Sequence, residues 1–247
     1  MKSPSMVMLR RNVKHIARNP MTVFNAVLMP VVVMLMFVYV FGDAFSVGVD
    51  YVDYATPGLL LLAVCYGLGS VAVSVNSDMT KGIINRFKVM DVPRSAVLTG
   101  HVIASLLTNL LAIAAIIGVA FLLGFSPSAS ALDWLGVIGV VALLGFAAGW
   151  LTIALGLAAK SPETAGLASV PLVMLPFFSS AIAPTDTMGP GVRQFAEYQP
   201  FTPIIETLRG LLNGTPTAGD VVPAIAWCAG IALVGYLWAS STFTKRA

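Results

Sequence analysis

Residues 57–88 read PGLLLLAVCYGLGSVAVSVNSDMTKGIINRFK, and this stretch decides which kind of fold the chain can adopt. Its first part, residues 57–75, is apolar and has no charged side chain, whereas the part that follows carries Asp78, Lys81, Arg86 and Lys88. An α-helix needs about 20 mostly apolar residues to cross the hydrocarbon core of a bilayer. The pattern therefore predicts a membrane-spanning helix that ends at a charged loop.

Five further stretches of the 247-residue chain repeat this apolar pattern, and none of the six contains Asp, Glu, Lys, Arg or His. The composition agrees, because 57% of the residues are hydrophobic and 10% are charged, against about 45–50% and about 25% in soluble domains. We therefore expect an all-α integral membrane protein, with residues 1–247 forming one transmembrane domain. The six predicted transmembrane helices are residues 21–41, 57–75, 102–123, 134–159, 165–183 and 221–239.

The charged residues are segregated between alternate loops. Lys and Arg gather in the N-terminal segment, in residues 76–101, at Lys160 and in the C-terminal tail, whereas the other loops hold only Arg193 and Arg209 among many acids. Loops rich in Lys and Arg stay in the cytoplasm. We therefore expect both termini to be cytoplasmic. The net charge of +3 is then a topology signal, and nucleic acid is not an expected partner.

Three segments outside the predicted spans have patterns of their own. In residues 5–19 the apolar side chains recur at helical spacing beside Arg and Lys, which predicts an amphipathic helix on the membrane surface. That helix serves either as a basic anchor or as a lever that touches a cytoplasmic partner. In the loop 76–101, Ile84, Phe87 and Met90 share one helical side, which suits docking in a groove of another protein, or packing against the ends of the protein's own spans.

The third segment, residues 184–220, is too long for a simple connection. Its apolar residues recur at helical spacing behind Pro200 and Pro203, and the pattern ends at Asn213 and Gly214. A helix of about 12 residues is too short to span a bilayer. We therefore expect a re-entrant helix on the outer side, before the sixth span, that dips into the outer leaflet or covers the bundle.

The sequence argues against several kinds of membrane enzyme or carrier. Proton relays keep ionisable groups at membrane depth, and the predicted spans have none. The only histidines, His15 and His101, fall at the cytoplasmic edge, and Cys65 and Cys228 lie far apart in apolar runs, so no catalytic base or metal site is indicated. The chain also lacks the glycine-rich loop that cradles nucleotide phosphates. Uphill transport would therefore need a partner that supplies energy.

Two groups of residues resemble the membrane subunit of ATP-binding-cassette exporters of the second export type, especially the daunorubicin-resistance-like permeases of bacteria. The first group runs from Asp78 to Phe87 and continues through residues 94–98; the second runs from Pro176 to Met188 and continues through residues 199–209. The chain departs from the family pattern at Asp91, where proline is usual, and at Ile182, where phenylalanine is common. The resemblance covers nearly the whole chain.

The resemblance implies that two permease copies, or this chain and a paralogous permease, work with two ATPase subunits that hold ATP and Mg, with no cofactor in this chain. It implies that the loop after the second span rests on the ATPase. The residues expected to couple to the ATPase are Asp78, Lys81, Gly82, Ile84, Arg86, Phe87, Met90, Pro93 and Arg94.

The resemblance also implies that the substrate route lies between spans two and five of the two permeases. The residues expected to line it are Tyr66, Ser70, Ser74, Met174, Phe177 and Phe178, although the same residues suit helix packing or lipid contact.

We thus expect a permease of the bacterial cytoplasmic membrane that exports a hydrophobic or amphipathic substrate, such as a drug or lipid, and has no catalytic residue. The rival interpretations are a secondary carrier that works without ATP, and a membrane scaffold subunit that does not transport. A secondary carrier would work in liposomes with an ion gradient and no added protein. A scaffold would bind partners without stimulating turnover.

Overall fold

The computed structural model describes residues 20–44, 47–80 and 94–246, and this part of the chain is helical, with no strand. The amphipathic segment 5–19 lies outside the described residues. The elements are α2 (Pro20–Met36), the π-helical turn η1 (Phe37–Phe41), η2 (Gly42–Ala44), α3 (Tyr51–Thr80), α5 (Arg94–Leu122), α6 (Ala131–Ala158), α7 (Pro162–Met174), η3 (Leu175–Phe178), η4 (Thr185–Thr187), α8 (Val192–Tyr198), α9 (Phe201–Leu212) and α10 (Ala218–Arg246).

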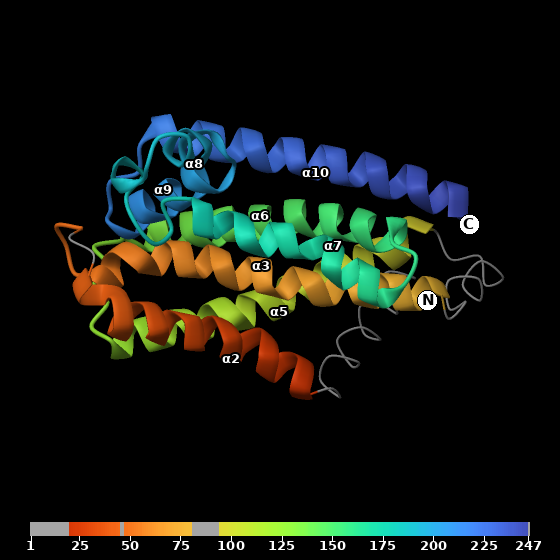
Figure 1. Ribbon diagram of the computed structural model, residues 1–247, viewed down its shortest axis with the longest axis horizontal. Coiled ribbons are helices and arrows are strands. Elements are labelled where there is room, and N and C mark those ends of the chain that lie inside the picture. Colours follow the sequence, from red (N-terminus) through yellow and green to blue (C-terminus); the bar gives the residue numbers. More distant parts are fainter. Residues whose placement is uncertain (1–19, 45–46, 81–93, 247) are drawn as a thin grey trace.

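Figure 1 shows α2, α3, α5, α6, α7 and α10 running lengthwise, with α8 and α9 gathered at one end of the bundle. Each lengthwise helix overlaps one predicted span. Within the described residues, four stretches are long and apolar enough to cross a membrane: Tyr51–Thr80, Val102–Leu122, Ala131–Ala158 and Ala218–Thr244. The apolar segments Val27–Phe41 and Pro162–Phe178 are shorter. The all-helical, apolar character is therefore confirmed, while six spans and their orientation remain predictions.

Helix α3 lies at the centre of the bundle, against α2, α5, α6, α7 and α9. Its residues Leu59 to Cys65 are buried without a break, so this helix has no apolar stripe but is covered on all sides over that length. Small residues let two neighbours come very close. A Cβ atom at Gly156 of α6 would lie 2.6 Å from the Ala72 carbonyl oxygen, and one at Gly58 would lie 2.5 Å from the Ala181 backbone.

Polar side chains set where two of the helices begin. Ser130 and Asp133 form a capping box at the start of α6, and Ser161 and Thr164 form another at the start of α7, where Pro162 occupies the first turn. Such caps satisfy backbone N–H groups that have no partner within the helix. The two helices therefore begin at positions fixed by short-range sequence.

The cytoplasmic-loop prediction and the fifth predicted span differ in extent from the observed helices. Helix α3 continues to Thr80 and α5 begins at Arg94, so both ends of the predicted loop 76–101 are helical. Helical structure after α7 stops at Phe178, whereas the predicted span runs to residue 183. Pro176 lacks a backbone N–H, and Ser179 has an extended backbone within a turn over residues 179–182.

The pair α8 and α9, termed the cap below, covers one end of the bundle. Helix α9 is the short helix predicted after Pro200, and Asn213 is its C-terminal capping residue. It buries Ile204, Ile205 and Leu208 against the bundle. The presence of this helix is thus confirmed, whereas its depth in a membrane remains a prediction.

Candidate functional site

Most residues predicted to couple to an ATPase, from Lys81 to Pro93, lie outside the described residues. Asp78 lies in the last turns of α3 and is buried, and Arg94 is the first residue of α5. The described helices therefore place the two ends of the predicted coupling segment at the end of the bundle opposite the cap. The assignment of its residues stays a prediction.

The three candidates for the substrate route on α3 share one face of that helix. Tyr66, Ser70 and Ser74 follow one another at intervals of four residues, and all three keep part of their surface accessible. The Ser70 hydroxyl donates a hydrogen bond to the Gly67 carbonyl at 2.8 Å. This stripe is therefore the most open face of an otherwise buried helix.

Two further candidates, Met174 and Phe178, line an apolar hollow of about 430 Å³. The wall of the hollow comes from α7, η3 and α8, and α3 contributes no residue to it. The described residues that line it are Pro171, Met174, Leu175, Phe178, Gly191, Val192 and Phe195. The hollow therefore presents two aromatic rings and a thioether, which suit an apolar or aromatic ligand.

The last candidate, Phe177, packs elsewhere. Its ring centroid lies 6.4 Å from that of Phe37 in η1, and Phe177 is not part of the lining of the hollow. The structure thus brings Met174 and Phe178 together, groups the three α3 residues separately, and places the Phe177 ring against η1.

The end of η3 and the stretch after it are held by side chains from other elements. Gln199 donates through Nε2 to the carbonyls of Phe178 at 2.7 Å and Leu175 at 3.3 Å. The Ser179 hydroxyl donates to the Pro176 carbonyl at 2.5 Å, and Tyr51 of α3 donates to the Ile182 carbonyl at 3.1 Å. Non-helical backbone inside a membrane protein persists only where such partners satisfy it. These donors therefore allow the helix to stop here.

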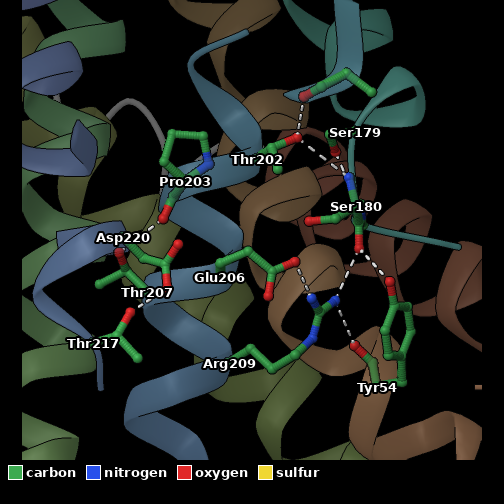
Figure 2. Close-up of polar contacts among 12 residues, drawn as sticks. Tyr54, Ser179, Ser180, Thr202, Pro203, Glu206, Thr207, Arg209, Thr217 and Asp220 are labelled. Carbon is green, nitrogen blue, oxygen red and sulfur yellow. Dashed lines mark hydrogen bonds and ion pairs between the residues drawn. The ribbon is translucent and has the colours of Figure 1, made fainter. Parts of the chain in front are cut away.

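Arg209 of α9 makes the largest set of contacts in this region, and Figure 2 shows it facing Tyr54 and Ser180. Its Nη2 donates to the Ser180 carbonyl at 2.8 Å and to the Tyr54 carbonyl at 3.2 Å, and Nη1 pairs with Glu206. The guanidinium carbon lies 4.0 Å from the centroid of the Tyr54 ring. The Tyr54 hydroxyl donates to the same Ser180 carbonyl at 3.1 Å.

These contacts join three separate elements. The Arg209 side chain is 13% exposed, and Tyr54 and Ser180 are buried. Hydrogen bonds from a charged group contribute about 1.5–3 kcal/mol each when they are shielded from water, and a cation over a ring contributes more when it is desolvated. Arg209, Glu206, Tyr54 and Ser180, termed the Arg209 network below, thus fasten the cap to α3 and to the stretch after η3.

Sequence reasoning missed this network as a unit. It used Glu206, Arg209, Gln199 and Ser180 as marks of family resemblance and counted Arg209 among the loop charges, but it did not consider Tyr51 or Tyr54. Two signals were present: Arg209 is one of two basic residues in loops full of acids, and Tyr51 and Tyr54 share one side at the start of α3. Neither signal names the partner, since the contacts join residues more than a hundred positions apart.

Arg193, the other basic residue of these loops, makes a local and exposed contact. Its Nε donates to Glu197 at 2.7 Å, one turn later in α8. The hydrogen bond and the charge of Glu197 raise the pKa of Arg193 above its ordinary value. Such a pair contributes little to stability because water screens it. Substitution of Arg193 is therefore a suitable control for substitution of Arg209.

Comparison with known proteins gives consistent matches. The family model described as "ABC-2 type transporter" matches residues 5–213. The chain is similar to a daunorubicin resistance ABC transporter permease protein of Streptomyces coeruleorubidus, with 30% identity over 217 residues that cover 87% of this chain and 77% of the relative. It is also similar to a probable doxorubicin resistance ABC transporter permease protein of Mycobacterium tuberculosis, with 26% identity over 221 residues, or 88% of this chain and 80% of the relative.

Proposed function

Because this chain belongs to the ABC-2 type transporter family, we propose that it is the permease subunit of an ATP-driven exporter in a bacterial cytoplasmic membrane. The observation that carries the proposal is the family match over residues 5–213, which includes the predicted coupling segment, the stretch after η3 and the cap. The described bundle of apolar helices supports a multi-pass membrane protein.

The energy comes from separate ATPase subunits, two per complex, which hold ATP and Mg. This chain has no phosphate-binding loop, and its named relatives are permease proteins. A second copy of this chain or a paralogous permease completes the complex. The loop between α3 and α5 then receives the movement of the ATPase, with Lys81 and Arg86 contacting it through charge and Phe87 and Met90 through apolar contact.

The substrate is hydrophobic or amphipathic. The hollow beside Met174 and Phe178 is lined by apolar side chains, and the accessible stripe of Tyr66, Ser70 and Ser74 adds hydroxyl groups on α3. The relatives carry names that refer to resistance to daunorubicin and doxorubicin, so doxorubicin is a reasonable probe. Phe177 has the least support as a lining residue because its ring packs toward Phe37.

The test is purification of the tagged chain in mild detergent from its native membrane, followed by identification of bound proteins and an ATP hydrolysis assay. We expect an ATPase with a phosphate-binding loop at a fixed ratio to the permease. The variant Arg86→Glu with Phe87→Ala should lose this partner, whereas the control Arg193→Gln, on an exposed helix at the cap, should retain it.

Transport by the purified complex in inside-out vesicles, with doxorubicin as probe, completes the test. Uptake that requires ATP supports the exporter. Uptake in the absence of any ATPase, driven by a proton or sodium gradient, would instead show a secondary carrier. A stable complex that neither hydrolyses ATP nor takes up any of several amphipathic probes would favour a scaffold subunit.

A further inference from the structure

Helix α3 connects the two ends of the bundle without interruption. Its 30 residues correspond to about 45 Å at 1.5 Å per residue. One end begins at Tyr51 beside the cap, and the other ends at Thr80, just after Asp78, the first residue of the predicted coupling segment. That segment joins α3 to α5, so its movement acts directly on both helices, and α3 is the one of the two to which Arg209 bonds.

The opposite end of α3 is held at two neighbouring places, one by the cap and one by the stretch after η3. Arg209 bonds to the Tyr54 carbonyl and lies over the Tyr54 ring, while Gly58, one turn later, touches the Ala181 backbone so closely that a Cβ atom would not fit. These contacts lie on both sides of Pro57, the one residue inside α3 that lacks a backbone donor. The helix is thus held where it would otherwise bend most easily.

The geometry of Arg209 suits attachment of several elements at once. A planar guanidinium can donate to two carbonyls, pair with a carboxylate and stack on a ring at the same time, which the point charge of lysine cannot do. The two carbonyls belong to α3 and to the stretch after η3, and the carboxylate belongs to α9. One side chain therefore joins α3, the stretch after η3 and the cap.

We infer that Arg209 is a positioning residue for transport: it makes the cap and the stretch after η3 move together with α3 when the coupling segment moves. This inference rests on the proposed function. Arg209 touches neither ATP nor the hollow. Removal of the Arg209 side chain should therefore leave ATP hydrolysis unchanged, while the cap no longer moves with each hydrolysis event.

The first experiment compares the number of doxorubicin molecules moved per ATP hydrolysed in the complex with its native ATPase. For Arg209→Gln we expect ATP hydrolysis to stay within about twofold of the wild type and transport per ATP to fall by about tenfold or more, in the range of ordinary coupling effects. Arg209→Lys should not restore coupling. The control Arg193→Gln removes an arginine–glutamate pair of the neighbouring helix and should behave as the wild type.

Two further variants separate coupling from folding. Tyr54→Phe keeps the ring under Arg209 and removes only the hydroxyl bond to Ser180, so its loss of coupling should be smaller than that of Arg209→Gln. Tyr54→Leu also removes the ring, so its loss of transport per ATP should lie between those of Tyr54→Phe and Arg209→Gln. Every variant must first purify with its ATPase in wild-type yield.

A second measurement leaves the Arg209 network intact and follows the distance between the cap and α3 directly. Spin labels are placed at Asp50→Cys before α3 and Asn213→Cys after α9, in a background where Cys65 and Cys228 are alanine and one permease copy is labelled. We expect the same label distance without nucleotide and with trapped ATP. The Arg209→Gln form of this protein should give a broader or shifted distance.

Failure of the Arg209 inference and failure of the exporter proposal give different results in these experiments. Equal transport per ATP in wild type and Arg209→Gln, or a label distance that changes with nucleotide in the wild type, would overturn the inference and leave the exporter intact. A wild-type complex without ATP-dependent uptake of any probe would overturn the exporter itself. Loss of transport per ATP in Arg209→Gln together with a constant wild-type distance supports the inference.

Discussion

At the scale of single residues, the contact between α3 and α6 depends on a missing side chain and one amide. The Asn76 amide nitrogen donates to the carbonyls of Gly156 at 2.9 Å and Ala159 at 2.8 Å, which satisfies the end of α6 from a neighbouring helix. At the same place Gly156 lies against the Ala72 carbonyl. A methyl group added there must push the two helices apart.

We therefore predict that Gly156→Ala lowers the free energy of unfolding by about 1–3 kcal/mol, the usual cost of overpacking a core. Gly139→Ala is the matched control, because Gly139 lies in the same helix and an added Cβ atom meets nothing within 4 Å. That control should be neutral or stabilising by up to about 1 kcal/mol. Denaturant unfolding of the purified protein in detergent measures both, and equal effects would contradict the close contact.

The sequence predicted little at this scale. It showed that Asn76 borders an apolar run and that glycines are frequent, but a glycine that allows close packing and a glycine on an open face look alike in the sequence. Gly156 and Gly139 illustrate this point, since both lie in one apolar helix. Only the position of the neighbouring backbone distinguishes them.

At the scale of elements, α9 was predictable and the end of η3 was not. The short helix could be read from its own residues: prolines before it, apolar residues at helical spacing within it, and Asn213 after it. The end at Phe178 depends on Gln199 and Tyr51, which come from distant parts of the chain. The apolar run 165–183 has no charge to mark that end, so it suggested a longer helix.

The Gln199 side chain gives a direct test of this account. We predict that Gln199→Leu destabilises the protein by about 1–3 kcal/mol, because the carbonyls of Leu175 and Phe178 lose their donor in a buried site. Limited proteolysis of the exposed stretch at residues 185–191 should become faster as the end of η3 loosens. Gln194→Leu changes an exposed glutamine in the same region and should leave both measurements at their wild-type values.

The hollow between α7 and α8 gives a prediction that rests on the proposed function. Phe195 lines it, whereas Tyr198, also on α8, is 79% exposed and does not. Loss of about 1 kcal/mol of apolar contact in Phe195→Ala should raise the doxorubicin concentration for half-maximal transport about fivefold. Tyr198→Ala should leave it unchanged, and an equal rise in both variants would remove the hollow from the substrate route.

At the scale of the whole molecule, the sequence predicted the class of fold and a sidedness. Composition and six uncharged runs were enough to indicate an all-helical membrane protein, because the bilayer imposes length and polarity on every span. In the described part of the chain, α2 begins and α10 ends at the same end of the bundle, opposite the cap. This arrangement is the one that a shared cytoplasmic location of both termini requires.

The sidedness can be tested with single cysteines in a background where Cys65 and Cys228 are alanine. A membrane-impermeant thiol reagent should label Tyr198→Cys in the cap of intact cells, and should label Lys160→Cys, between α6 and α7, only after the membrane is opened. Both positions are exposed, so access to the reagent decides the result. The reverse pattern would invert the orientation predicted from the Lys and Arg distribution.

The central place of α3 also imposes an order on the making of the protein. Helix α3 is synthesised before α5, α6, α7 and α9, four of the helices that bury it. Chains are inserted from the N-terminus onward, so Thr56 and Asn76 leave the ribosome long before their final surroundings exist. The burial of α3 is therefore completed only when α9 has emerged, and a chain cut short before residue 201 exposes the side of α3 that α9 covers.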